Sequence, residues 1–136
     1  ENFRLNSVSD DKYENVEADV FCYLRKLRAE KRTFDMIILD PPKFIDSQKA
    51  LDRGCRAYKD IALLGFQLLN PGGLLVNFSC SGHMDSALFQ KITADALLDS
   101  GKHRMIVRTL QQAPDHPVAL EFPEALYLKG FVCRLQ

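Results

Sequence analysis

The sequence lacks an excess of charge of either sign and any long apolar run. Its 18 lysine and arginine residues balance 18 aspartate and glutamate residues, so no overall field attracts nucleic acid or an anionic membrane surface. No apolar run is long enough to cross a bilayer, and residues 1–30 are too polar for a signal peptide. We therefore expect a cytoplasmic protein with no membrane partner.

Cysteines are too few and too widely spaced for a disulfide scaffold or a zinc site. They stand at Cys22, Cys55, Cys80 and Cys133, and none has the close neighbour that zinc-binding cysteines have. We expect no metal site and four reduced thiols. Cys22, Cys55 and Cys133 fall inside expected helices or a strand, so we interpret them as packing residues.

The composition and the spacing of apolar residues indicate one α/β domain. The 136 residues are 46% hydrophobic and 26% charged, which is ordinary for a single globular domain. The spacing predicts a helix from Val20 with Asp19 as its cap, a second over about residues 49–69, and a third that starts after Asp85 or Ser86. Strands are predicted at 15–19, 36–39, 74–78, 105–110 and 126–135, with a loop over 113–124. This alternation is typical of a parallel sheet with helical crossovers.

Two polar loops follow the two most apolar strands, which we expect to be buried on both faces. Functional residues of parallel sheets gather beyond the carboxyl ends of the strands, here residues 40–44 and 79–83. If the two strands are parallel neighbours, Asp40 and Cys80 emerge at the same edge. A carboxylate beside two prolines can hold a flat ring, and an exposed cysteine can act as a nucleophile. Taken singly, Asp-Pro-Pro is also an ordinary end of a strand, and Cys80 could be a packing residue.

Several segments together resemble the RlmI-type methyltransferases. The resemblance rests on residues 38–44, 56–60, 77–84 and 127–131. That family uses S-adenosylmethionine to methylate carbon 5 of a cytosine in large-subunit (23S) ribosomal RNA. Asp-Pro-Pro alone is not specific, because amino-group methyltransferases carry a similar tetrapeptide. The resemblance implies a Rossmann-like class I methyltransferase fold, with a mixed sheet that ends in an antiparallel strand pair.

The resemblance also implies roles for the residues that match the family. Cys80 would be the catalytic nucleophile, and Asp40 the catalytic aspartate that meets the amino edge of the ring. The implied cofactor-binding residues are Asp19, Val20, Asp40 and Pro41. The candidate substrate-binding residues are Pro42, Lys43, Phe44 and Lys59, the lysines because cations at a rim attract phosphate. His83 and His116 are weaker candidates at the same rim, and the base that removes the carbon 5 proton is not assigned.

One departure from the family is large, because no two glycines stand as Gly-x-Gly. Residues 1–6 correspond to a position after the second strand of the family, so the first two strands and the glycine-rich loop have no counterpart. We therefore expect residues 1–136 to be a partial catalytic domain, its C-terminal portion, inactive alone and with weak or absent binding of S-adenosylmethionine. Ribosomal RNA would be bound through domains outside these residues, and the strand at 36–39 would become a sheet edge that could pair with a second copy.

Two other interpretations remain open. Methylation of an amino nitrogen, of the N6-adenine type, would use Asp-Pro-Pro and need no cysteine. A non-catalytic fragment or interaction module would account for the missing glycine-rich loop. The neutral charge and the lack of interleaved aromatic and basic residues argue against sequence-specific RNA binding by residues 1–136 alone.

Overall fold

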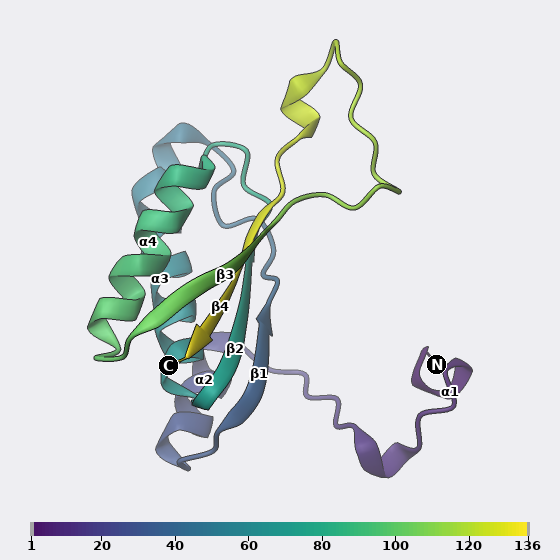
Figure 1. Cartoon of the computed structure of the whole chain (residues 1–136), viewed down its shortest axis with the longest axis vertical. Coiled ribbons are helices and arrows are strands. Elements are labelled where there is room, and N and C mark those ends of the chain that lie inside the picture. Colours follow the sequence, from purple (N-terminus) through teal and green to yellow (C-terminus); the bar gives the residue numbers. More distant parts are fainter. Residues whose placement is uncertain (1, 136) are drawn as a thin grey trace.

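The computed structural model describes residues 2–135 and contains a four-stranded sheet with helices against one of its faces (Figure 1). In chain order the helices and strands are α1 (Asn2–Leu5), α2 (Val20–Ala29), β1 (Phe34–Leu39), α3 (Leu51–Gln67), β2 (Leu69–Ser79), α4 (Ser86–Asp99), β3 (Arg104–Leu110) and β4 (Lys129–Leu135). Single 3₁₀ turns occur at Asp10–Lys12, Gln48–Ala50 and Pro123–Ala125.

The strand order in the sheet is β1-β2-β4-β3. β1 and β2 are parallel, with Leu39 opposite Asn77, and α3 forms the crossover between them. β4 is antiparallel to both β2 and β3. The expected mixed sheet with an antiparallel pair at its end is therefore confirmed.

The core lies between the sheet and the helices α3 and α4. The ring of Phe89 on α4 stacks on that of Phe131 on β4 at 5.4 Å and meets the edge of Tyr58 on α3 at 5.7 Å. α3 lies close to the parallel strands at Gly65, where an added Cβ would come within 2.9 Å of Leu75 and 3.1 Å of Leu39. A side chain at this position would push α3 away from β1 and β2, which carry the strand ends of interest.

The predicted starts of α2 and α4 are confirmed, whereas α3 is shorter than the predicted 49–69 and runs from Leu51 to Gln67. The Asp19 carboxylate accepts a hydrogen bond from the Cys22 backbone N–H at 2.8 Å and caps α2. Asp85 caps α4 in the same way, by accepting from the Leu88 N–H at 2.7 Å. Just past α4, Gly101 takes a φ of +66°, a left-handed conformation that glycine adopts easily.

Four details of the sequence interpretation are wrong. Residues 15–19 form no strand, since no described residue pairs with them, and a lone short strand is not stable. β2 begins at Leu69, earlier than predicted, because a bulge opposite β1 accommodates the Pro-Gly-Gly segment. β4 begins only at Lys129, since the preceding backbone N–H groups of residues 127 and 128 donate to the side chain of Gln112. Cys22 is exposed and is not a packing residue.

One face of the sheet has no helix against it among residues 2–135, so the expectation that β1 is buried on both faces is also wrong (Figure 1). Met36 is 52% exposed and Ile38 is 62% exposed. Ile38 lies opposite Val76, which lies opposite Val132. Apolar side chains therefore form a row across three strands on what we call the open face.

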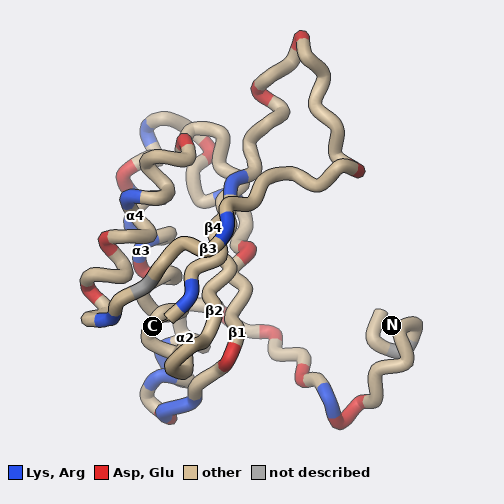
Figure 2. Tube along the Cα trace, viewed as in Figure 1, with Lys and Arg blue, Asp and Glu red and all other residues tan. Residues whose placement is uncertain are grey.

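A long arm, residues 111–128, projects from the end of the sheet between β3 and β4 (Figure 1). Its charged residues are all acidic, namely Asp115, Glu121 and Glu124 (Figure 2). Leu120 in the arm is 98% exposed. Among the described residues, no helix has the length and apolar character needed to span a bilayer.

We predict that this chain self-associates through β1 and the open face, because an unpaired edge strand with exposed apolar residues attracts a second copy. Sedimentation velocity should show a dimer or larger species. Ile38→Lys should return it to a monomer, whereas Leu98→Lys, on the exposed side of α4, should not. A monodisperse monomer of the unaltered chain would contradict the prediction.

Candidate functional site

The ends of β1 and β2 form the candidate site. Leu39, the last residue of β1, lies two residues before the end of β2 in the parallel register. Asp40 and Cys80, the residues that follow these two strands, therefore emerge at the same edge of the sheet, as the sequence predicted. Asp40 is exposed, Pro41 is buried and Cys80 is half-buried. A carboxylate and a thiol thus meet solvent at neighbouring strand ends.

A cavity of about 370 Å³ lies between the start of α2 and the loop after β1. We call it the Asp40 cavity. It brings together all four residues predicted to bind the cofactor and two predicted to bind substrate. It is lined by Asp19, Val20, Phe21, Ile38, Leu39, Asp40, Pro41, Pro42, Phe44 and Ile61. Apolar walls with carboxylates at the rim suit a flat ring that carries amino or hydroxyl groups.

The aromatic side of the Asp40 cavity is fixed by ring contacts. Phe44 lies 4.8 Å from Tyr58 and 6.0 Å from Phe21, measured between ring centroids. Tyr58 is fully buried. The Phe44 ring is therefore held from the core side, and it is a wall of the cavity more than a free substrate contact.

Asp19 caps the N-terminus of α2 and also lines the Asp40 cavity. The hydrogen bonds from the start of α2, above all from the backbone of Cys22, hold the pKa of this carboxyl below its ordinary value. Asp19 is therefore ionised at neutral pH. One of its oxygens, Oδ1, is occupied by the Cys22 N–H.

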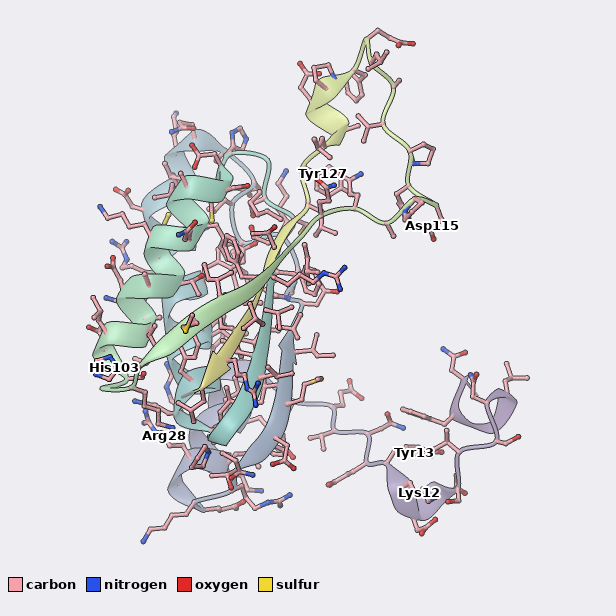
Figure 3. The ribbon with its side chains drawn as sticks, in the orientation of Figure 1. Lys12, Tyr13, Arg28, His103, Asp115 and Tyr127 are labelled. Atoms are coloured by element: carbon pink, nitrogen blue, oxygen red, sulfur yellow. The ribbon has the colours of Figure 1, made fainter. Side chains whose placement is uncertain are left out.

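A second cavity, of about 480 Å³, shares none of its lining residues with the Asp40 cavity. We call it the Lys129 cavity. The loop after β1, the loop after β2 and the base of the arm surround it, and Figure 3 shows Tyr127 at that base. It is lined by Lys43, Gly82, His83, Met84, Asp85, Ser86, Glu124, Leu126, Tyr127 and Lys129. The structure thus brings Lys43 and His83 together, in a cavity of mixed charge.

The loop that carries Cys80 is tied down at its next residue, Ser81. The Ser81 side chain is fully buried, and its Oγ lies 2.9 Å from the Tyr58 hydroxyl and accepts from the Ile45 N–H at 3.3 Å. The Ser81 N–H donates to the Ser79 Oγ at 3.3 Å. Lys129 Nζ donates to the Ser81 carbonyl at 2.7 Å. Side chains from α3 and β4 therefore fix the loop beside Cys80.

Sequence reasoning missed Lys129 and the hydroxyl of Tyr58. The ring of Tyr58 lies in the core, while its hydroxyl reaches Ser81 in the loop after β2. Lys129 had a visible signal, because it is a lone cation at the entry to the apolar run of β4. A charged residue in that position needs a partner in the fold.

Two residues proposed for the rim are not brought to either cavity. Lys59 lies on α3, where its Nζ pairs with the Asp99 carboxylate of α4 at 2.8 Å. The hydrogen bond with Asp99 raises the pKa of Lys59. His116 lies exposed in the arm beside Asp115, and its Nδ1 is 3.3 Å from that carboxylate.

The fold agrees with that of solved methyltransferases. A Streptococcus mutans protein described as a SAM-dependent methyltransferase superposes with a TM-score of 0.80 at 24% identity, over 97% of this chain and 33% of its own. The protein SMU.776, described as a methyltransferase and solved with SAH, gives 0.80 at 23% identity over 97% and 34%. The arrangement of helices and strands is thus that of a class I methyltransferase fold.

Sequence comparison gives a narrower result. The chain is 52% identical, over 99% of its length, to ribosomal RNA large subunit methyltransferase I of Shewanella frigidimarina. It is 50% identical, over 98%, to the protein of the same name from Pseudoalteromonas atlantica. The similarity expected from the sequence motifs is therefore confirmed. The chain spans about a third of these relatives, 34% of each. No family model matches it.

The pH dependence of stability should report on the Asp19 cap. Because folding lowers the pKa of Asp19, its contribution to the free energy of unfolding is complete above the unfolded pKa of about 3.9. That contribution is lost as the pH falls through the lower folded pKa. In urea titrations from about pH 6 to pH 2, Asp19→Asn, which keeps a capping acceptor, should show a shallower loss than the parent. The control is Glu17→Gln, which removes an exposed carboxylate before α2 and should show the same pH dependence of stability as the parent. Equal slopes for Asp19→Asn and the parent would contradict the assignment.

Proposed function

We propose that this chain is the substrate-facing part of a methyltransferase that methylates carbon 5 of a cytosine in 23S ribosomal RNA. The observation that carries the proposal is the position of Asp40 and Cys80 at neighbouring ends of parallel strands. The relatives with 50–52% sequence identity, both named ribosomal RNA large subunit methyltransferase I, support it. The substrate and the site of methylation follow from the resemblance and from the chemistry available to Cys80.

S-adenosylmethionine is the proposed cofactor, and the Asp40 cavity fits part of it. Flat apolar walls at Val20, Pro41 and Phe44 suit an adenine ring, and the ionised Asp19 carboxylate lies at the same cavity. When bound, the cofactor supplies an electrophilic methyl group. The neighbour SMU.776 was solved with SAH, which is consistent with this choice.

The remaining chemistry belongs to residues of this chain. The Cys80 thiolate adds to carbon 6 of the ring, and the Sγ–C6 bond makes carbon 5 nucleophilic. Asp40 accepts from the amino group of the cytosine and, with Pro42, fixes the ring. After carbon 5 has gained the methyl group, its proton passes to a base, for which His83 in the Lys129 cavity is the candidate. The C5–C6 double bond then re-forms as the Sγ–C6 bond breaks, and the thiolate is regenerated.

The longer protein implied by the relatives would supply what residues 1–136 do not. We propose that this chain is the C-terminal portion of its catalytic domain, and that the preceding part holds the glycine-rich loop and a ribosomal RNA-binding domain. The open face and the free edge of β1 leave room for further secondary structure against the sheet. Its place of action would be the cytoplasm, where ribosomal RNA is found.

Methylation of an amino nitrogen is the second candidate. The Asp40-Pro41-Pro42 segment at the end of β1 favours it, because that segment can hold the amino group of a base without help from a cysteine. The half-buried thiol at the matching end of β2 favours carbon 5 chemistry instead. The role of Cys80 decides between them.

We predict that Cys80→Ala lowers the rate of methylation by at least about a thousandfold in the longer protein, because carbon 5 chemistry has no route without the nucleophile. RNA that carries 5-fluorocytosine should become covalently attached to the unaltered enzyme through Cys80, since fluorine cannot leave as a proton does. Mass spectrometry of the protein–RNA adduct measures this.

The matched control is Cys55→Ser, on α3, which should still trap the RNA. Trapping by Cys80→Ser as efficient as by the parent would reject Cys80 as the nucleophile. Methylation without any adduct, with a product modified on an amino nitrogen, would establish the second candidate.

We also predict that residues 1–136 alone do not bind S-adenosylmethionine at micromolar concentration. Loss of about four hydrogen bonds from a glycine-rich loop, at roughly 1 kcal/mol each, weakens affinity about a thousandfold. Isothermal titration calorimetry on this chain should show no saturable heat. Micromolar binding would mean that the Asp40 cavity is sufficient for the cofactor.

A further inference from the structure

Lys129 is a buried cation beside the proposed nucleophile. It is the first residue of β4 and lies opposite Ser79, the residue before Cys80. The residue is only 8% exposed. Its Nζ donates to the Ser81 carbonyl, the residue after Cys80. Lys129 therefore contacts the residues on both sides of Cys80. It pairs with Ser79 in the sheet and donates a hydrogen bond to Ser81.

Among the residues that the structure describes, no carboxylate lies within ion-pairing distance of this ammonium group. The free-energy cost of burying its charge is therefore not offset by an ion pair. Burial lowers the pKa of Lys129, whereas the charges of the Cys80 thiolate and of Asp85 raise it. A buried ammonium with only a carbonyl partner is costly. An anion that forms at Cys80 offsets that cost, and the benefit is mutual, because a nearby cation favours a thiolate.

We propose that Lys129 is a positioning residue that holds the Cys80 loop through the Ser81 carbonyl and, by its charge, favours the thiolate form of Cys80. This rests on the proposed function, in which Cys80 attacks the ring. The role goes beyond support of the backbone, because Tyr58, Ile45 and Ser79 already fix Ser81 at its side chain and N–H. Lys129 adds what those neutral groups do not, a positive charge.

Other charged and titratable groups lie around the same position and bear on any pH dependence. They are Asp40 and Lys43 from the loop after β1, Tyr58 from α3, His83 and Asp85 from the loop after β2, and Glu124 and Tyr127 from the arm. Lys43 is exposed, so solvent screens its charge, whereas Lys129 is buried and its field is screened less. Lys43 is therefore the matched lysine against which the effect of Lys129 is measured.

The test is the pH dependence of alkylation of Cys80 by iodoacetamide in this chain, followed by peptide mass spectrometry. Lys129→Gln keeps a donor for the Ser81 carbonyl but removes the charge, and it should move the midpoint of Cys80 alkylation to higher pH. Lys129→Arg should restore most of the parent profile. Lys43→Met should leave it unchanged, and Cys22, exposed on α2, gives an internal control in every sample.

An unchanged Cys80 midpoint in Lys129→Gln would overturn the proposal, and so would failure of Lys129→Arg to restore it. If Lys129→Gln does not fold, as judged by circular dichroism, Lys129→Met removes the charge and the donor together, and its Cys80 midpoint is compared with that of Lys129→Arg. The readout needs neither RNA nor cofactor, so it stands apart from the proposed function. A shifted midpoint in this chain, together with a longer protein that never traps 5-fluorocytosine RNA, would keep the charge coupling and reject carbon 5 chemistry through Cys80.

A second readout uses the longer protein. Lys129→Gln should lower kcat at pH 7 about tenfold. The kcat should return toward the parent value at higher pH, where the Cys80 thiolate forms without a nearby positive charge. Its KM for S-adenosylmethionine should stay unchanged, because Lys129 does not line the Asp40 cavity. A fall in kcat of equal size at every pH would assign Lys129 a structural role only.

Discussion

The parallel pairing of β1 with β2 is the constraint on which the rest of the site depends. It aligns Leu39 with Asn77 and so brings Asp40 and Cys80 to one edge of the sheet. The pairing needs a crossover helix that lies close to both strands, and Gly65 allows α3 to approach Leu39 and Leu75. A chemical arrangement at the surface thus follows from a close contact in the core.

Tyr58 connects that core to the loop after β2, which carries Cys80. Its ring packs between Phe44 and Phe89, while its hydroxyl reaches Ser81 in the loop. A buried phenol of this kind supplies apolar area at one end and a hydrogen bond at the other. One wall of the Asp40 cavity and the backbone beside Cys80 are therefore held by the same residue.

The sheet has two unlike faces. Helices α3 and α4 cover one, and the exposed Met36 and Ile38 mark the other (Figure 1). Parallel strands are normally covered on both faces, which is why the apolar run of β1 suggested burial on both sides. The run has the composition of a strand that is buried on both faces, but residues 2–135 place helices on only one face of the sheet. This agrees with relatives that are about three times as long.

Local chemistry along the chain determined the elements and the candidate residues. Apolar periodicity placed α2, α3 and α4, aspartates at 19 and 85 marked two of their starts, and the motifs around Asp40 and Cys80 indicated the methyltransferase fold. Tertiary structure alone decided which strand pairs with which, and hence that residues 15–19 pair with no strand in the described part of the chain. It also decided that Lys59 pairs with Asp99 away from the cavities, and that Lys129 lies buried against Ser81. These features depend on contacts between residues far apart in sequence, which local propensity and spacing do not report.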